Sequence, residues 1–345
     1  MTFKCLCTLG ILLVTGLLSA QQRWLTSADT ALQTDGVFTE FPLPNPGSGP
    51  TTIALAQDGM LWFTESAGNR IGRMNPDGTD LKEFPLPNAG SSPRIIALGS
   101  DGNMWFSEHS GNRMGRIRPD GTISEFSIPT PNSMPRAIAL GSDGNIWFGE
   151  FGGGKIGRIT AQGVITEFPI PTLDSGPRAL AGGADGNIWF SEFNASKIGR
   201  ITPQGVITEF PLPRPNSGPG DITAGADGNM WFVELAGTID ARKPDGNRVG
   251  RITMAGEITE FPIPSQSGSP INVAVGPDRN VWFTKGSLVG RVTPDGTITE
   301  FPLKTSNAGA TGLTAGSDRQ PPTRLSNRLW IAESAANSLG FLSFK

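Results

Sequence analysis

The chain of 345 residues has one histidine, two cysteines and no tyrosine, and its charges nearly balance, with 28 Lys and Arg against 31 Asp and Glu. The few cysteines and the single histidine exclude a zinc site with four His or Cys ligands. A net charge of −3 gives no electrostatic basis for binding nucleic acid or an anionic membrane surface, so we expect neither as a partner. Any histidine chemistry has to use His109.

Residues 1–20 have the features of a secretion signal. Lys4 precedes an apolar run over residues 5–18, and Ser19 and Ala20 then offer a small-residue cleavage site. The run is short for a membrane span, although a retained N-terminal anchor is the alternative. Both cysteines lie inside this segment, so the mature protein would have no disulfide. We expect a secreted or periplasmic protein with no membrane attachment after cleavage, in which residues 21–33 form a linker.

The remaining residues contain one unit seven times, most often with a spacing of 42 residues. In the third unit, residues 136–140, 146–148, 156–160 and 164–170 are predicted strands, and Asp143-Gly144 supplies a hairpin turn. Four short strands in each unit, without helical periodicity, predict an all-β, seven-bladed β-propeller over residues 34–345. Each unit contains one tryptophan, and these are Trp62, Trp105, Trp147, Trp189, Trp231, Trp282 and Trp330.

The two ends of the chain predict how the ring closes. The first Glu-Phe strand, over residues 37–43, precedes the first tryptophan, whereas the last unit stops after its third strand. We therefore expect the N-terminal strand to complete the last blade, because closure removes an open sheet edge.

Residues that recur in every unit are predicted to serve the scaffold. Trp and Phe are adjacent in six units, so they point to opposite faces of a strand, and both faces are buried if blades pack on each side. The arginines of the third strands, from Arg73 to Arg291, are expected to pair across the hairpin with the glutamates of the fourth strands, from Glu40 to Glu300.

One rim of the propeller is the expected ligand site, because the loops that enter the blades and the loops between second and third strands emerge there. Three successive blades offer arginine at this rim, and six offer glutamate. One interpretation is a solvated ring of Arg–Glu pairs; the other is a polar pocket with an electropositive arc. In the second interpretation Phe151 and Phe193 either floor the pocket or pack under a loop. The candidate ligand-binding residues are Arg94, Arg136, Arg178, Glu150, Glu192 and Thr311.

The candidate catalytic residues lie at the same rim. His109 is a candidate base, because its side chain titrates near neutral pH, and Glu108 is its neighbour. Lys285 stands where the other units have glutamate. Two units carry enlarged loops, at residues 236–247 and 319–326; the first is either a rim or lid of the ligand site or a tolerated insertion.

The unit over residues 175–213 resembles that of the virginiamycin B lyase (streptogramin B lyase) family, and the resemblance extends over residues 37–345. It implies a seven-bladed propeller that opens a cyclic depsipeptide antibiotic by Mg²⁺-assisted elimination, with a histidine as the base. The sequence departs from this family where the chemistry is expected. The resemblance places the two functional histidines at Ile271 and Thr311, a metal-ligating glutamate at Gly309 and a tyrosine at Thr51. Glu333 is the near match to the second metal-ligating glutamate, displaced by about one position.

Three functions therefore stay open. The first is a secreted, monomeric, lyase-like propeller that binds a small or peptidic ligand at the channel mouth and lacks the catalytic histidines. The second is an active Mg²⁺-dependent carbon–oxygen lyase for a streptogramin B or a related ester, using Glu108, Glu333, Lys285 or His109. The third is an extracellular interaction module that uses the side of the propeller.

Overall fold

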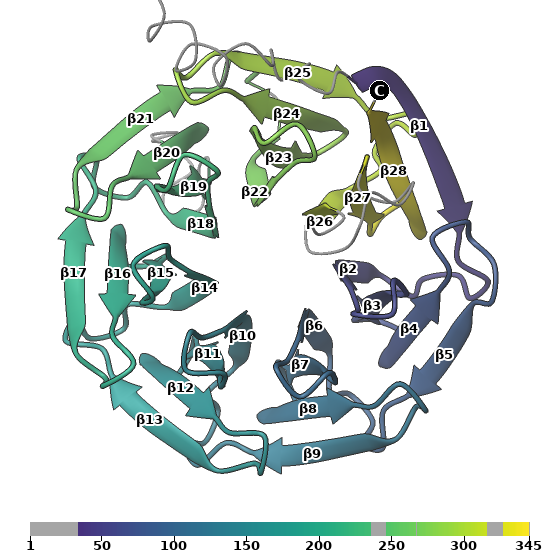
Figure 1. Cartoon of the computed structure of the whole chain (residues 1–345), viewed down its shortest axis with the longest axis horizontal. Helices are drawn as coiled ribbons and strands as arrows, with labels where there is room; N and C mark the ends of the chain where they lie inside the picture. Colours follow the sequence, from purple (N-terminus) through teal and green to yellow (C-terminus); the bar gives the residue numbers. More distant parts are fainter. Residues whose placement is uncertain (1–33, 236–245, 267, 316–326, 345) are drawn as a thin grey trace, which may run out of the picture.

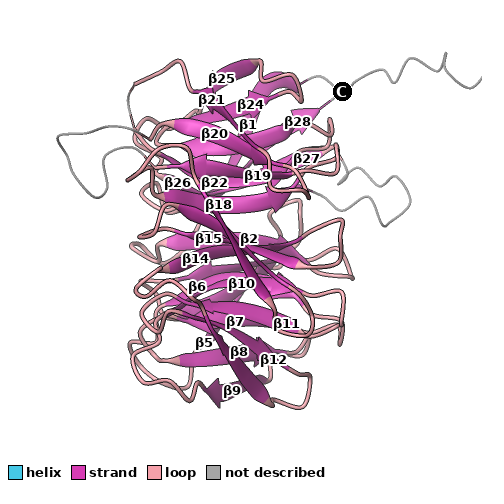
Figure 2. Cartoon of the chain, turned by 90° about the vertical axis from the view of Figure 1, so that its left-hand side faces the viewer, coloured by secondary structure: helices cyan, strands magenta, loops and turns pink. Residues whose placement is uncertain are grey.

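The computed structural model describes residues 34–235, 246–266, 268–315 and 327–344. These residues form seven four-stranded antiparallel sheets around a central channel (Figure 1). Seen from the side, the ring consists of strands and connecting loops (Figure 2), and within the described ranges no helix is long and apolar enough to cross a membrane. The predicted signal, linker and enlarged-loop segments at residues 1–20, 21–33, 236–245 and 319–326 lie outside the described residues.

Each sheet is one blade, and its strands follow the chain order from the channel outward. The innermost strands are β2 (Pro50–Leu55), β6 (Pro93–Leu98), β10 (Pro135–Leu140), β14 (Pro177–Gly182), β18 (Pro219–Ala224), β22 (Pro270–Val275) and β26 (Ala310–Ala315). The second strands are β3 (Leu61–Glu65), β7 (Met104–Glu108), β11 (Ile146–Glu150), β15 (Ile188–Glu192), β19 (Met230–Glu234), β23 (Val281–Lys285) and β27 (Arg328–Glu333). The third strands are β4 (Arg70–Met74), β8 (Arg113–Ile117), β12 (Lys155–Ile159), β16 (Lys197–Ile201), β20 (Arg248–Ile252), β24 (Leu288–Val292) and β28 (Ser338–Phe344). The outermost strands are β5 (Lys82–Pro85), β9 (Ile123–Ser127), β13 (Ile165–Pro169), β17 (Ile207–Pro211), β21 (Ile258–Pro262), β25 (Ile298–Pro302) and β1 (Thr34–Pro42).

The N-terminal strand closes the ring, as the sequence predicts. The seventh sheet has the order β1-β28-β27-β26, so the first strand of the chain is the outermost strand of the last blade. Phe41 lies opposite Leu339, and Thr34 lies opposite Phe344. The Phe41 ring also stacks on Trp330, with the two centroids 6.1 Å apart. Every blade therefore has four strands.

The hydrophobic core lies between the blades. In each unit the tryptophan of the second strand and the residue after it are buried, and they belong to different core clusters. Trp147 of the third blade packs in one cluster with Phe190 of the fourth, and Trp330 of the last blade packs with Phe63 of the first. The predicted burial of both strand faces is therefore confirmed. The contact between Trp330 and Phe63 also joins the last blade to the first.

The recurring Gly-Arg glycine makes room for that core. Gly157 lies opposite Phe148 in the sheet, and a Cβ atom on Gly157 would come within 2.1 Å of the Phe148 ring. No larger residue fits at this position without displacing the ring. The turn glycine Gly163 has a φ of +87° and lies beneath the Phe126 ring of the preceding blade, so it meets both a conformational and a steric requirement.

The predicted pairing of third-strand arginines with fourth-strand glutamates is wrong. The Arg116 guanidinium lies 5.3 Å from the centroid of the Trp105 ring and donates a hydrogen bond of 2.7 Å to the carbonyl of Ala161 in the next blade. Glu125 of the fourth strand instead has its Oε2 atom 3.6 Å from Nε of Arg113, at the start of the third strand. Arg73, Arg158, Arg200 and Arg251 donate to backbone carbonyls of the next blade in the same way, and sequence spacing within one hairpin cannot reveal such links.

Candidate functional site

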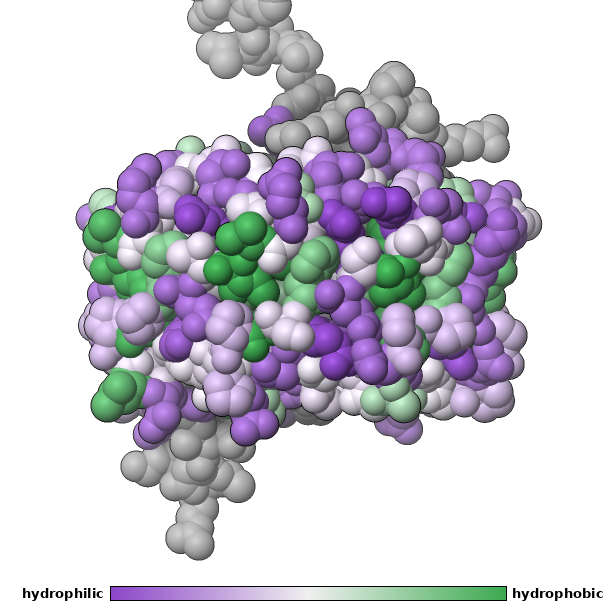
Figure 3. Space-filling model, turned by 90° about the horizontal axis from the view of Figure 1, so that it is seen from below, coloured by the Kyte–Doolittle hydropathy of each residue, from purple (hydrophilic) through white to green (hydrophobic). Residues whose placement is uncertain are grey.

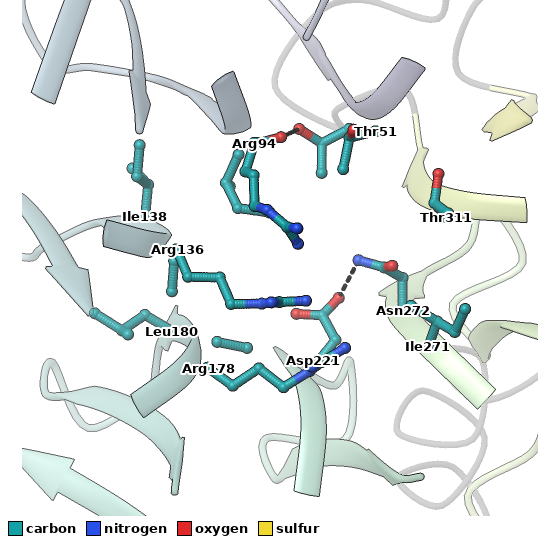
Figure 4. A pocket seen from close by; sticks show the side chains of 14 residues that line it. Thr51, Arg94, Arg136, Ile138, Arg178, Leu180, Asp221, Ile271, Asn272 and Thr311 are labelled. Carbon is teal, nitrogen blue, oxygen red and sulfur yellow. Dashed lines mark hydrogen bonds between the residues drawn. The ribbon is translucent and has the colours of Figure 1, made fainter. Parts of the chain in front are cut away.

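A cavity of about 270 Å³ lies at the mouth of the central channel. Its walls are built from the first residues of the seven innermost strands (Figure 4). It is therefore on the rim that the sequence indicates. The lining residues are Thr51, Thr52, Arg94, Ile95, Arg136, Ala137, Ile138, Arg178, Ala179, Leu180, Asp221, Ile271, Asn272 and Thr311.

Three arginines from adjacent blades form one side of this cavity. Arg94, Arg136 and Arg178 occupy the same position in their units, directly after the proline that begins the innermost strand. Figure 4 shows Arg94 and Arg136 directed into the cavity, with Asp221 and Asn272 opposite them. The structure thus brings the three arginines of the predicted electropositive arc together at one cavity. We refer to these three side chains as the arginine arc.

Aromatic rings support two members of the arginine arc. The Arg136 guanidinium lies 5.9 Å from the centroid of the Phe151 ring, and the Arg178 guanidinium lies 5.1 Å from that of Phe193. The two rings also contact each other, with centroids 6.3 Å apart. Cation–π contacts of this kind hold a guanidinium in place without neutralising its charge.

The arginine arc carries more positive charge than Asp221, the one carboxylate of the described lining, can balance. Among the described residues, no ion pair or side-chain hydrogen bond engages any of its three guanidinium groups, and Nε of Arg94 is buried without a partner. Burial, followed by the positive charges of Arg178 and Arg94, lowers the pKa of Arg136 to about 9. Burial also lowers the pKa of Arg178 to about 10, although the negative charge of Asp221 opposes this shift. The arrangement therefore carries an electrostatic cost.

Among the described residues, Asp221 is the one acidic residue of the lining, and sequence reasoning missed it. Its Oδ2 atom accepts hydrogen bonds from the backbone N–H of Val273, at 3.0 Å, and from Nδ2 of Asn272, at 3.1 Å. Burial raises the pKa of Asp221, and these hydrogen bonds oppose the shift. A signal was available, because Asp221 and Asn272 stand where the units of the arginine arc have Ile95, Ala137 and Ala179.

The positions at which the family resemblance places a tyrosine and two histidines line the cavity as well. They are Thr51, Ile271 and Thr311. Thr311, a candidate ligand-binding residue, has its Oγ1 atom 3.2 Å from the carbonyl oxygen of Pro50, to which it donates a hydrogen bond. The wall opposite the arginine arc is therefore formed by uncharged side chains and Asp221.

The candidate residues Glu150 and Glu192 are not part of the cavity lining. Both side chains are fully buried at the ends of β11 and β15, and none of their carboxyl oxygens has a hydrogen-bond partner among the described residues. Burial, followed by the negative charge of Glu167, raises the pKa of Glu150 to about 8. Burial and Glu209 raise the pKa of Glu192 to about 8 in the same way. A solvated ring of Arg–Glu pairs is therefore the wrong interpretation of the rim.

The three candidate catalytic residues do not form one site. Oε2 of Glu108 makes a salt bridge of 2.7 Å to Arg113, and burial raises the pKa of Glu108. Lys285 is buried in the sixth blade, where its Nζ donates hydrogen bonds to the carbonyl and hydroxyl oxygens of Ser265. Burial lowers the pKa of Lys285, and Glu300 opposes this shift.

His109 lies at the rim, outside the cavity lining. Its Nδ1 atom is 3.3 Å from the carbonyl oxygen of Pro135. Burial and then the positive charges of Arg94 and Arg136 lower the pKa of His109, so the ring is neutral at neutral pH. In its unit His109 occupies the place that Phe151 and Phe193 occupy in theirs, directly after the last residue of the second strand. His109 is therefore the third aromatic side chain at this position of the repeat, with Phe151 and Phe193.

The surroundings of Glu333 do not fit a magnesium site. Its side chain is fully buried, and its Oε2 atom accepts a hydrogen bond of 2.6 Å from the hydroxyl of Ser338. Burial raises the pKa of Glu333, and the negative charge of Glu40 adds to the shift. Mg²⁺ prefers oxygen ligands in an octahedron that includes several waters, whereas within the described part of the chain no three His, Cys, Asp or Glu side chains gather around a possible metal position.

Comparisons with known proteins agree with this architecture. The model of the Virginiamycin B lyase family matches residues 19–242 and 174–345. A crystal structure of virginiamycin B lyase from Staphylococcus aureus is 36% identical, with a TM-score of 0.81, and the match covers 89% of this chain and 99% of that one. A catalytically inactive histidine-to-alanine variant of the S. aureus enzyme, crystallised with quinupristin, is 37% identical, with the same coverages and TM-score. The curated virginiamycin B lyase of Bacillus licheniformis is 46% identical over 41 residues, and this match spans 12% of the present chain and only 14% of the relative.

Proposed function

The chain belongs to the virginiamycin B lyase family, and we propose that it binds a small or peptidic ligand at its channel mouth without the family's elimination chemistry. The observation that carries this proposal is the cavity itself. All seven innermost strands contribute to it, and its lining includes three arginines but no histidine. Concave sites with a few convergent polar groups are the usual places at which proteins bind small molecules.

The missing base supports a binding role. Elimination needs a base to remove a proton and a cation to stabilise the developing negative charge. The S. aureus virginiamycin B lyase variant is described as inactive when a histidine is replaced by alanine. The present chain has His109 alone, and His109 does not line the cavity. Its place in the repeat matches two phenylalanines, so a scaffold role accounts for it.

We do not include Mg²⁺ in this function. The glutamate that the resemblance offers as a ligand, Glu333, is buried, does not line the cavity and already accepts a hydrogen bond from Ser338. The one acid of the lining, Asp221, has both carboxylate oxygens engaged, because Oδ1 accepts from the backbone N–H of Ile222 and Oδ2 accepts from Asn272 and Val273.

An active carbon–oxygen lyase is the second candidate, and the similarity to virginiamycin B lyases over nine-tenths of the chain favours it. In that case the Mg²⁺-dependent enzyme would open a streptogramin B or a related ester, using Glu108, Glu333, Lys285 or His109. The third candidate, docking through the propeller's side, has less support. Figure 3 shows apolar residues on one side of the ring as islands among polar ones, and a docking face is usually a continuous apolar patch.

We further propose that the protein is secreted or periplasmic and acts as a monomer. The features of residues 1–20 support export, since a charged start, a short apolar run and a small-residue site occur together. Closure of the ring by β1 supports a monomer, because the seventh sheet is complete with four strands, and the outermost strands of the other six blades have only four or five residues.

Incubation of the purified protein with quinupristin, with Mg²⁺ or with EDTA, tests the absence of lyase chemistry. Elimination opens the ring without changing the mass, whereas hydrolysis adds one water, so chromatography with mass spectrometry distinguishes the two. We expect unchanged antibiotic, while S. aureus virginiamycin B lyase serves as the positive control. Metal-dependent opening that is lost in His109→Ala would establish the second candidate instead.

A screen of small molecules and peptides by thermal shift tests the binding function. We expect a saturable increase in melting temperature that Arg136→Gln abolishes. If every compound stabilises the variant and the original protein equally, the channel mouth is not the binding site.

A further inference from the structure

Resting on the proposed ligand-binding function, we propose that the ligand of the channel mouth is a small organic dianion, such as a dicarboxylate, that the arginine arc binds. This chemistry differs from that of the depsipeptide implied by the family resemblance. The proposal follows from the charge, the geometry and the size of the cavity.

The charge of the cavity calls for an anion. In the part of the lining that the structure describes, three guanidinium groups face one carboxylate, so two positive charges are unbalanced even when Asp221 is ionised. Asp221 is also occupied, since its carboxylate accepts hydrogen bonds from Asn272 and two backbone N–H groups. In the folded protein without a ligand, Arg94, Arg136 and Arg178 are therefore close enough to repel one another. A ligand with two negative charges would neutralise the excess.

The geometry favours acidic groups that accept paired hydrogen bonds. A guanidinium presents its N–H donors in a planar fork that matches a carboxylate or a phosphate. The members of the arginine arc come from β6, β10 and β14, which are adjacent strands of a rigid ring. Contacts with Phe151 and Phe193 position Arg136 and Arg178 before any ligand arrives, so little side-chain order has to be gained on binding.

The size and the other lining residues favour an organic dianion over an inorganic one. The volume of about 270 Å³ is just below the usual range for pockets of drug-sized ligands, yet it exceeds what one phosphate or sulfate fills. Ile138, Leu180 and Ile271 line it with apolar surface, which suits a short carbon skeleton. Thr51, beside Arg94, and Thr311 add hydroxyl groups to the lining (Figure 4).

Calorimetry and thermal shift with defined probes test this inference. Succinate and adipate are compared with the neutral isostere succinamide and with sulfate, all at equal ionic strength. We expect saturable binding of at least one dicarboxylate, no binding of the diamide, and weaker binding of sulfate. Arg136→Gln should weaken dicarboxylate binding by about tenfold or more, as expected for loss of a charged hydrogen-bonding partner.

A matched control and a measurement without ligand keep the test specific. Arg118→Gln removes the same charge from an exposed turn at the opposite rim, and it should leave dicarboxylate affinity unchanged. In the absence of ligand, Arg136→Gln should raise the melting temperature, because it removes an unbalanced buried cation. A stable Arg136→Gln protein with unchanged affinity would overturn the inference.

The outcomes also separate this inference from the proposed function. If peptides or quinupristin bind at the channel mouth but the dicarboxylates and sulfate do not, the anion inference fails and the binding function stands. If the succinamide binds as well as succinate, charge is not what the cavity recognises, and the inference fails. If no compound in either screen gives a saturable effect, both fail.

Discussion

Replacing Glu150 by glutamine should make the protein more resistant to alkaline pH. The Glu150 side chain is fully buried at the end of β11, and both of its oxygens are without a hydrogen-bond partner among the described residues. Lys155, whose charge acts on Glu150, donates instead to Oε2 of Glu167, at 2.9 Å. Burial and the charge of Glu167 together raise the pKa of Glu150 to about 8, so the folded protein keeps this carboxyl protonated at neutral pH.

The sign of the effect follows from proton binding in the two states. In the unfolded chain a glutamate has its ordinary pKa of 4.5, so between pH 4.5 and about 8 the unfolded state loses a proton that the folded state retains. The free energy of unfolding therefore falls as pH rises through this window, and the full loss is present above pH 8. At about 1.4 kcal/mol for each pH unit, the upper limit is about 5 kcal/mol. Relaxation and water entry reduce the penalty of a buried charge, and we expect on the order of 2 kcal/mol.

Urea denaturation followed by tryptophan fluorescence at pH 5, 7 and 9 measures this effect. Glutamine has the shape of a protonated glutamate and no titration, so Glu150→Gln should match the original protein at pH 5 and exceed it by about 2 kcal/mol at pH 9. The matched control is Glu65→Gln, because Glu65 makes a salt bridge of 2.7 Å to Arg70; this change should lower stability at neutral pH. An advantage of Glu150→Gln that is equal at all three pH values, or absent at pH 9, would refute the reasoning.

Three further predictions concern closure and the rim. Deleting residues 21–43 removes β1 and the Phe41 ring, and it should cost well over the about 3 kcal/mol of the ring alone; an unchanged melting temperature would contradict closure by this strand. His109→Phe should keep stability within about 1 kcal/mol and leave dicarboxylate affinity unchanged in calorimetry, because two other blades have phenylalanine there; a large loss of affinity would mean that the ring contacts the ligand. Asp221→Asn should raise dicarboxylate affinity several-fold, since it removes the one negative charge of the lining; a fall would show that Asp221 is itself a ligand contact.

Much of the scaffold could be predicted because the residues that define the strands and turns of each unit are close together in the sequence. A Trp-Phe pair buried on both strand faces requires a neighbouring blade on each side, and the Asp-Gly turns mark each hairpin. The surplus strand at the N-terminus and the missing strand at the C-terminus predict closure. The arginine arc could also be predicted, since equivalent positions in three successive units carry arginine and equivalent positions lie at one rim.

The partners of individual side chains could not be predicted in the same way. Arg116 was expected to pair within its hairpin, but its hydrogen-bond partner, Ala161, belongs to the next blade. Glu150 was expected at the cavity, but its side chain is buried within the blade. Which partner a side chain meets depends on how neighbouring blades approach each other. The spacing of residues within one unit does not contain this information.

The sequence by itself determined the number of blades, the closure by the two chain ends and the rim at which the cavity lies, because these follow from local strand patterns repeated at a fixed period. Only the tertiary structure decided that three arginines meet in one cavity with Asp221 as the one carboxylate among the described lining residues, while six rim glutamates are buried elsewhere. Charge balance is a property of distances between side chains on different blades, and those distances exist only once the ring is closed.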